Sequence, residues 1–217
     1  MSEGLVFYTN PMSRGRIARW MLEEVGVPYR TVVLDYGTTM KLPEYLAINP
    51  MGKVPAITHR GVAVTEAAAV CAYLADAFPQ AGLAPDVGDP KRGTYYRWLF
   101  FAAGPVEAAV SAKALGLLAP PDKKGQVGYG SFEDTVDALE SAVRDGPYIL
   151  GDRFSAADVY VGSQIGWGLM FKTLEPRAAF VAYSQRLRER PAAKRAAELD
   201  DAAMPAPAPA LAPAPAG

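Results

Sequence analysis

The stretch Asn49-Pro50-Met51-Gly52-Lys53-Val54-Pro55 predicts more about the fold than any other part of this chain. Its prolines and glycine indicate a turn, and the apolar residues 54–57 that follow indicate a strand. A proline cannot donate a backbone hydrogen bond, so Pro55 at the start of a strand predicts an edge position in the sheet. Proline also permits a cis peptide bond, which would turn the preceding backbone toward a ligand.

Strand and helix patterns surround this stretch on both sides. The order predicts a βαβ unit followed by an αββα unit, which is a thioredoxin-like α/β layer arrangement. The expected strands are residues 5–8, 31–34, 54–58 and 62–64, and the expected helices are 16–25, 42–48 and 65–78. We therefore expect an N-terminal α/β domain over residues 1–79.

The second half of the chain contains only helical patterns. Prolines and turn formers predict a linker over residues 80–89, followed by an all-α bundle over residues 90–200. A long helix over residues 91–118 is expected to bend at Gly104-Pro105. Residues 201–217 are dominated by Pro-Ala repeats, which predict an extended, disordered tail.

Composition excludes several classes of function. The 217 residues carry a formal net charge of −1, which argues against a nucleic-acid partner. One cysteine, Cys71, and one histidine, His59, allow neither an internal disulfide nor a Cys/His metal cluster. The chain shows no secretory signal and no membrane-length apolar run, so we expect a soluble cytoplasmic protein.

Four motifs in order give the chain a family resemblance. They are residues 8–14 (Tyr-Thr-Asn-Pro-Met-Ser-Arg), residues 49–55, residues 65–67 (Thr-Glu-Ala) and residues 155–158 (Ser-Ala-Ala-Asp). Together they resemble the cytosolic glutathione transferases, and the resemblance fades after about residue 200. It implies that the Val54-Pro55 peptide is cis and that the Val54 backbone pairs with the cysteine of glutathione.

The loop after the first strand offers several groups that can stabilise a thiolate. Ser13 stands at the mouth of a predicted helix, whose free N–H groups favour an anion, although serine is equally a preferred helix cap. The resemblance favours Ser13, because several classes of the family hold the glutathione thiolate with a serine in this loop. Tyr8 is the second candidate and Arg14 the third, and Asn10 and Thr9 are further possible donors.

The resemblance also implies which residues bind the rest of glutathione. Glu66 is expected to bind the γ-glutamyl ammonium, although a carboxylate there is also simply favourable in the first turn of a helix. Ala67 departs from the family, which usually has a hydroxyl here for the γ-glutamyl carboxylate, but its backbone N–H can still serve. Lys41 and Lys53 are expected near the glycyl carboxylate, and solvated side chains are the alternative.

Other notable residues suggest structural roles. Cys71 lies on an apolar helical stripe and is expected in the core. Ser155 and Asp158 have the spacing of a helix capping box. Five aromatic residues between positions 95 and 101 are too many to lie on one face of a helix. Some are therefore expected in the core and others in an apolar pocket or a subunit contact.

These observations predict a glutathione transferase that joins the glutathione thiolate to a small hydrophobic electrophile. Glutathione is the expected co-substrate, no metal site is expected, and the resemblance implies a homodimer. Two alternatives remain: a glutathione-dependent disulfide reductase or isomerase, and a non-catalytic binding protein that keeps the fold.

Overall fold

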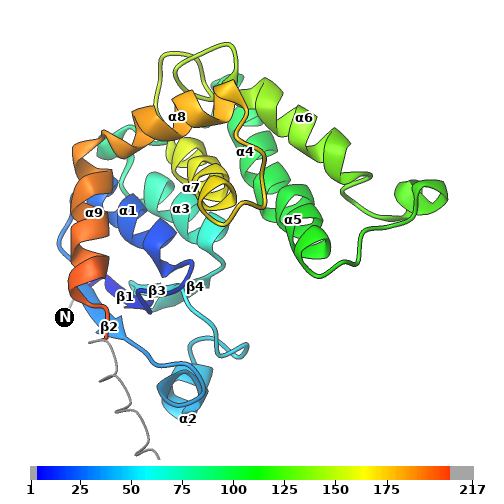
Figure 1. The fold of residues 1–217 in the computed structure, drawn as a ribbon. Coiled ribbons are helices and arrows are strands. Elements are labelled where there is room, and N and C mark those ends of the chain that lie inside the picture. Colours follow the sequence, from blue (N-terminus) through cyan, green and yellow to red (C-terminus); the bar gives the residue numbers. More distant parts are fainter. Residues whose placement is uncertain (1–3, 206–217) are drawn as a thin grey trace, which may run out of the picture.

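The computed structural model describes residues 4–205. The N-terminal half is built around a four-stranded mixed sheet (Figure 1). The strand order is β2-β1-β3-β4. Strand β1 pairs in parallel with β2 and antiparallel with β3, and β3 pairs antiparallel with β4. The strands are β1 (Val6–Thr9), β2 (Arg30–Val33), β3 (Ala56–His59) and β4 (Val62–Thr65).

Helices cover both faces of this sheet (Figure 1). Because successive side chains on a strand point to opposite faces, neighbouring residues enter different cores. Phe7 and Ile57 pack in the core that contains α1 (Gly15–Val25) and α3 (Ala67–Ala77). Tyr8 and Ala56 pack instead with Tyr45 of α2 (Pro43–Leu46). The expected thioredoxin-like α/β arrangement is confirmed.

The predicted edge position of Pro55 is wrong. Strand β3 lies between β1 and β4 and has partners on both sides. Pro55 is tolerated because β3 begins at Ala56, so the residue without an N–H precedes the first paired position. The cis peptide expected at Val54-Pro55 is confirmed.

The part of the structure beyond residue 90 is helical, as predicted. The bend expected at Gly104-Pro105 is a π-helical turn, Ala102–Val106, which separates α4 from α5. The helices are α4 (Lys91–Phe101), α5 (Glu107–Ala114), α6 (Phe132–Val143), α7 (Ala156–Met170), α8 (Ala178–Arg188) and α9 (Pro191–Ala202). Within residues 4–205, no helix combines the length and apolarity needed to cross a bilayer.

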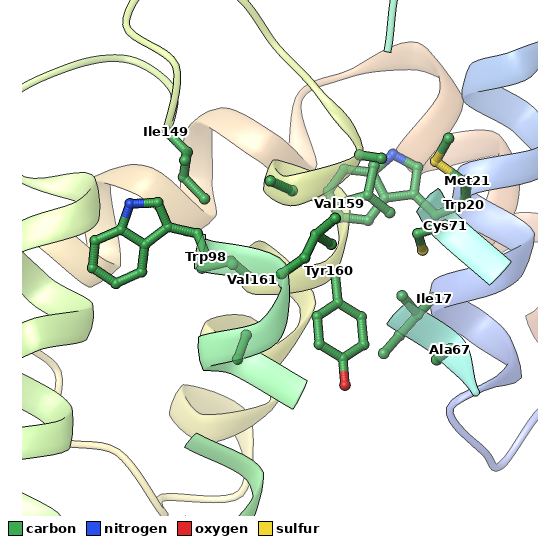
Figure 2. Packing of buried hydrophobic residues seen from close by; sticks show 14 of the residues in the cluster. Ile17, Trp20, Met21, Ala67, Cys71, Trp98, Ile149, Val159, Tyr160 and Val161 are labelled. Carbon is green, nitrogen blue, oxygen red and sulfur yellow. The ribbon is translucent and has the colours of Figure 1, made fainter. Parts of the chain in front are cut away.

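Helix α7 joins the helices of both halves in one apolar core (Figure 2). Its Tyr160 belongs to the same core as Ile17 of α1 and Cys71 of α3, and Cys71 is fully buried as expected. The predicted capping box begins this helix: the Ser155 backbone N–H donates to Asp158 Oδ2 at 2.9 Å. The two halves are therefore packed around α7 rather than merely tethered.

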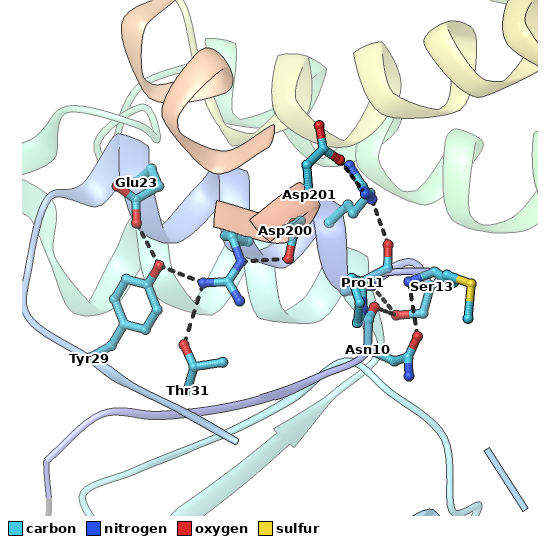
Figure 3. A network of polar contacts seen from close by, with 12 residues as sticks. Asn10, Pro11, Ser13, Glu23, Tyr29, Thr31, Asp200 and Asp201 are labelled. Atoms are coloured by element: carbon cyan, nitrogen blue, oxygen red, sulfur yellow. Dashed lines mark hydrogen bonds and ion pairs between the residues drawn. The ribbon is translucent and has the colours of Figure 1, made fainter. Parts of the chain in front are cut away.

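Helix α9 returns to the N-terminal half and packs along α1 (Figure 1). Arg19 of α1 donates to Asp200 of α9 at 2.6 Å, and Arg16 donates to Asp201 at 2.7 Å (Figure 3). Asp201 and Ala202, which we expected in the tail, thus complete α9 because α1 offers them a partner surface. The remaining tail prediction, from residue 206 onward, lies outside the described residues.

Candidate active site

The turn over residues 49–55 is held by side chains from α2 and its surroundings. Both the Tyr45 hydroxyl and Asn49 Nδ2 donate to the carbonyl oxygen of Lys53, at 2.6 and 2.7 Å. Lys41 Nζ donates to the carbonyl of Gly52 at 2.9 Å. Lys41 therefore supports the turn. Burial raises the pKa of Tyr45 to about 12, so the Tyr45 hydroxyl stays protonated and remains a donor. The Lys53 side chain is exposed.

This support leaves the backbone of Val54 open. Across residues 4–205, neither the N–H nor the C=O of Val54 forms a backbone hydrogen bond, although the residue is half-buried. Backbone polar groups this close to a core usually have a partner. The Val54 backbone is therefore available to pair with the backbone of a peptide-like ligand.

Glu66 follows the β3–β4 hairpin and precedes α3 in an unusual backbone conformation. Its φ is 65° and its ψ is 119°, which side-chain-bearing residues rarely adopt. Its side chain is exposed, whereas that of Ala67 is buried. Strained residues that the surrounding structure maintains are concentrated at ligand sites. Glu66 thus presents a carboxylate beside the free N–H groups of the α3 N-terminus.

The β1–α1 loop is closed by local hydrogen bonds (Figure 3). The Ser13 hydroxyl donates its proton to the carbonyl of Asn10 at 2.6 Å and accepts the N–H of Gly15 at 2.9 Å. The Asn10 side chain donates from Nδ2 to the carbonyl of Leu34 at 2.8 Å. Ser13 thus closes a local turn just before α1, whose N-cap is Arg14, and it would have to release the Asn10 carbonyl to donate to a sulfur atom.

Tyr8 and Thr9 lie on opposite faces of β1. The Tyr8 ring lies 5.6 Å from the Tyr45 ring and packs against the same cluster as Val54. Thr9 is fully buried, and its hydroxyl has no hydrogen-bond partner among the described residues. A Cβ atom at Gly15 would collide with that hydroxyl, which explains the glycine at the start of α1.

Arg14 points from the start of α1 to the helical half of the chain. It forms an ion pair with Glu107, the first residue of α5. The other carboxylate oxygen of Glu107 accepts from Gln164 Nε2 of α7 at 3.1 Å. Glu107 and Gln164 were not predicted from the sequence, in which Pro105, two residues before Glu107, was the one nearby signal of an unusual backbone.

Family models match both halves of the chain. The model for the glutathione S-transferase N-terminal domain matches residues 12–77, and that for the C-terminal domain matches residues 107–167. Glutathione S-transferase GstA of Escherichia coli O157:H7 is 30% identical over 152 residues, which cover 68% of this chain and 74% of that protein. The chain belongs to the glutathione S-transferase family.

Solved structures agree with this assignment. A glutathione transferase from Methylococcus capsulatus superposes with a TM-score of 0.75 at 27% identity, covering 91% of this chain and 99% of that one. A glutathione transferase homologue from Sulfitobacter, solved with bound glutathione, gives a TM-score of 0.71 at 29% identity and covers 93% of this chain and 99% of that one. The fold and the family are therefore shared.

Proposed function

We propose that this protein is a glutathione transferase that joins the sulfur of glutathione to small hydrophobic electrophiles. The observation that carries the proposal is the open backbone of Val54 after a braced turn, together with the exposed carboxylate of Glu66, which follows Thr65, the strand partner of Ala56. The first suits the cysteinyl backbone of glutathione, and the second suits its γ-glutamyl ammonium. The Sulfitobacter homologue with bound glutathione supports this assignment.

The chemistry needs a thiolate and an electrophilic carbon. The free thiol has a pKa of about 8.5, and lowering it by ~2 units requires about 2.7 kcal/mol of preferential stabilisation of the thiolate. The N-terminus of α1, a hydroxyl and the Arg14 cation are the available contributors. The thiol proton leaves to solvent, sulfur donates an electron pair to form the S–C bond, and the leaving group departs with its own electron pair.

Ser13 is the proposed hydroxyl donor, with Tyr8 and Arg14 as the other candidates. For glutathione binding we propose Val54, Pro55, Glu66 and the Ala67 N–H, with Asn10 bracing the loop and Lys53 near the glycyl carboxylate. Lys41 is proposed to act through the turn that it supports. The end of the N-terminal domain at residue 79 and the start of the helical domain at residue 90 stay predictions. The cytoplasmic location also stays a prediction.

Retention on immobilised glutathione, followed by conjugation of an activated aryl halide, tests the proposed function. We expect retention, elution by free glutathione, and formation of the thioether product. Retention without conjugation, but with reduction of a glutathione mixed disulfide, would favour the reductase alternative. Retention with neither activity would favour a non-catalytic binding protein. The absence of a side-chain hydroxyl at Ala67 is the feature that favours this alternative.

A homodimer is also proposed, on the basis of an exposed aromatic surface on α4. Tyr95 and Trp98 are buried in the core, whereas Phe100 is 73% exposed and Tyr96 is 37% exposed. Exposed aromatic side chains grouped on one helix are typical of a protein contact. The prediction that some of these aromatic residues belong to the core is confirmed, and we propose that the exposed ones contact a second copy.

A further inference from the structure

A chain of polar contacts crosses between the two halves of the molecule at the N-terminus of α1. Arg14, whose side chain is half-exposed, pairs with Glu107 of α5. Gln164 Nε2 of α7 lies 3.1 Å from Glu107 Oε2 and 3.3 Å from the Tyr160 hydroxyl. Arg14 is therefore fixed by helices that belong to the opposite half of the chain.

The backbone that precedes Glu107 is itself exceptional. Residues 102–106 form a π-helical turn with Pro105 inside it. A π turn inserts an extra residue and so changes the direction in which all later side chains leave the helix. Such turns are frequent at functional sites. This backbone feature is a separate observation from the ion pair, and Glu107 is the first residue after it.

We propose that Glu107 is a positioning residue for Arg14, holding the guanidinium beside the N-terminus of α1 where the glutathione thiolate is stabilised. The inference rests on the proposed function. A guanidinium has five N–H donors, so the Nη atom used by Glu107 leaves others free for a sulfur anion. Gln164 holds the Glu107 carboxylate in turn.

The alternative is that Glu107 is merely a surface charge near the site, and the two roles predict opposite effects. A nearby carboxylate disfavours a thiolate, so its removal would lower the thiol pKa if charge alone mattered. If Glu107 positions Arg14, its removal frees a long, flexible side chain that must then be ordered at an entropic cost. In that case the thiol pKa rises.

The experiment is a titration of the thiol of bound glutathione by its thiolate absorbance, in the wild type and five variants. In Glu107→Ala we expect the thiol pKa to rise by about half a unit, equivalent to a roughly three-fold smaller acid dissociation constant of the thiol. Arg14→Ala should shift it at least as far, and the double variant no further than Arg14→Ala. Glu107→Gln should stay near the wild type, because its amide oxygen still accepts from Arg14.

The matched control is Glu140→Ala. Glu140 pairs with Arg177, and its side chain is 28% exposed against 30% for Glu107. It should leave both the thiol pKa and kcat unchanged, whereas Glu107→Ala should lower kcat more than it raises the KM for glutathione. An unchanged or lowered thiol pKa in Glu107→Ala, or additive shifts in the double variant, would overturn the positioning role of Glu107 but not the proposed function. A wild type that shows no thiolate signal with glutathione would overturn the proposed function itself.

Discussion

Arg19 and Asp200 form a buried ion pair between residues 181 positions apart (Figure 3). Their side chains are 5% and 1% exposed, and Arg19 Nε lies 2.6 Å from Asp200 Oδ1. Burial raises the pKa of Asp200, and the contact with Arg19 opposes this by favouring the carboxylate. Helix α9 is the last helix of the described residues, and α1 follows the first strand. This ion pair therefore joins the N-terminal and C-terminal parts of the structure.

Asp200→Ala should destabilise the fold strongly, because it leaves the Arg19 cation buried without its partner. Removing one member of a buried pair typically costs about 3–5 kcal/mol in free energy of unfolding. Urea denaturation monitored by circular dichroism measures this loss. Asp201→Ala is the control: its side chain is 66% exposed beside Arg16, so a loss below about 1 kcal/mol is expected. Equal losses in the two variants would refute a special role for the buried pair.

Glu66→Gly should separate stability from ligand binding. Glycine adopts positive φ without steric cost, so the variant should unfold no more easily than the wild type and gain up to about 1 kcal/mol. Its affinity for glutathione, measured by calorimetry, should fall because the carboxylate is lost. Arg60→Gly is the matched control, since Arg60 also has a positive φ, 52°, in the β3–β4 turn. Unchanged glutathione affinity in Glu66→Gly would contradict the assigned role.

Ser13→Ala should raise the thiol pKa of bound glutathione and lower kcat, with a smaller effect on glutathione affinity. This is the pattern for a donor that acts mainly on the charged form. Tyr8→Phe and Arg14→Ala must be compared with the same electrophile. If Ser13→Ala behaves as the wild type while Tyr8→Phe loses activity, the role belongs to Tyr8. If none of these variants changes the rate, backbone amides and Asn10 or Thr9 become the candidates.

His59 should make the fold less stable in mild acid. Burial, together with the nearby Arg60, lowers the pKa of His59, and its Nδ1 lies 2.9 Å from the Tyr73 hydroxyl. The unfolded chain therefore binds more protons just below pH ~6.5, so the free energy of unfolding rises with pH in this window and falls as pH drops through it. Urea midpoints for the wild type and His59→Gln between pH 5 and 8 measure the effect. An identical pH slope in both proteins would exclude this contribution.

Phe100→Asp should convert the proposed dimer to a monomer. A charge placed in an apolar contact must be desolvated when the subunits join, which opposes association. Light scattering at micromolar concentration gives the mass directly. Leu115→Asp is the control, because Leu115 is 71% exposed just beyond α5 and outside the proposed contact. A monomeric wild type, or a dimer that tolerates Phe100→Asp, would contradict the proposed interface.

The sequence by itself determined the local features of this protein. The turn at residues 49–55 and the Ser155–Asp158 capping box were predictable from the residues, and the family resemblance implied the cis Val54-Pro55 peptide. Helix α9 was expected only as part of a helical bundle, whereas the strands and the helices of the N-terminal half were predicted from their patterns to within a few residues. Each depends on backbone chemistry or periodicity that a short window of residues already contains.

Only the tertiary structure decided which distant side chains meet. Arg14 and Glu107 are 93 residues apart, and Glu107 and Gln164 are 57 apart. Charged residues on helix surfaces are common and carry no mark of their partner, so their pairing depends on how α1, α5, α7 and α9 pack. The position of β3 inside the sheet likewise came from strand pairing, which the proline at its start did not reveal. Periodicity encodes which face of an element is buried, whereas the identity of the element packed against it is a property of the whole fold.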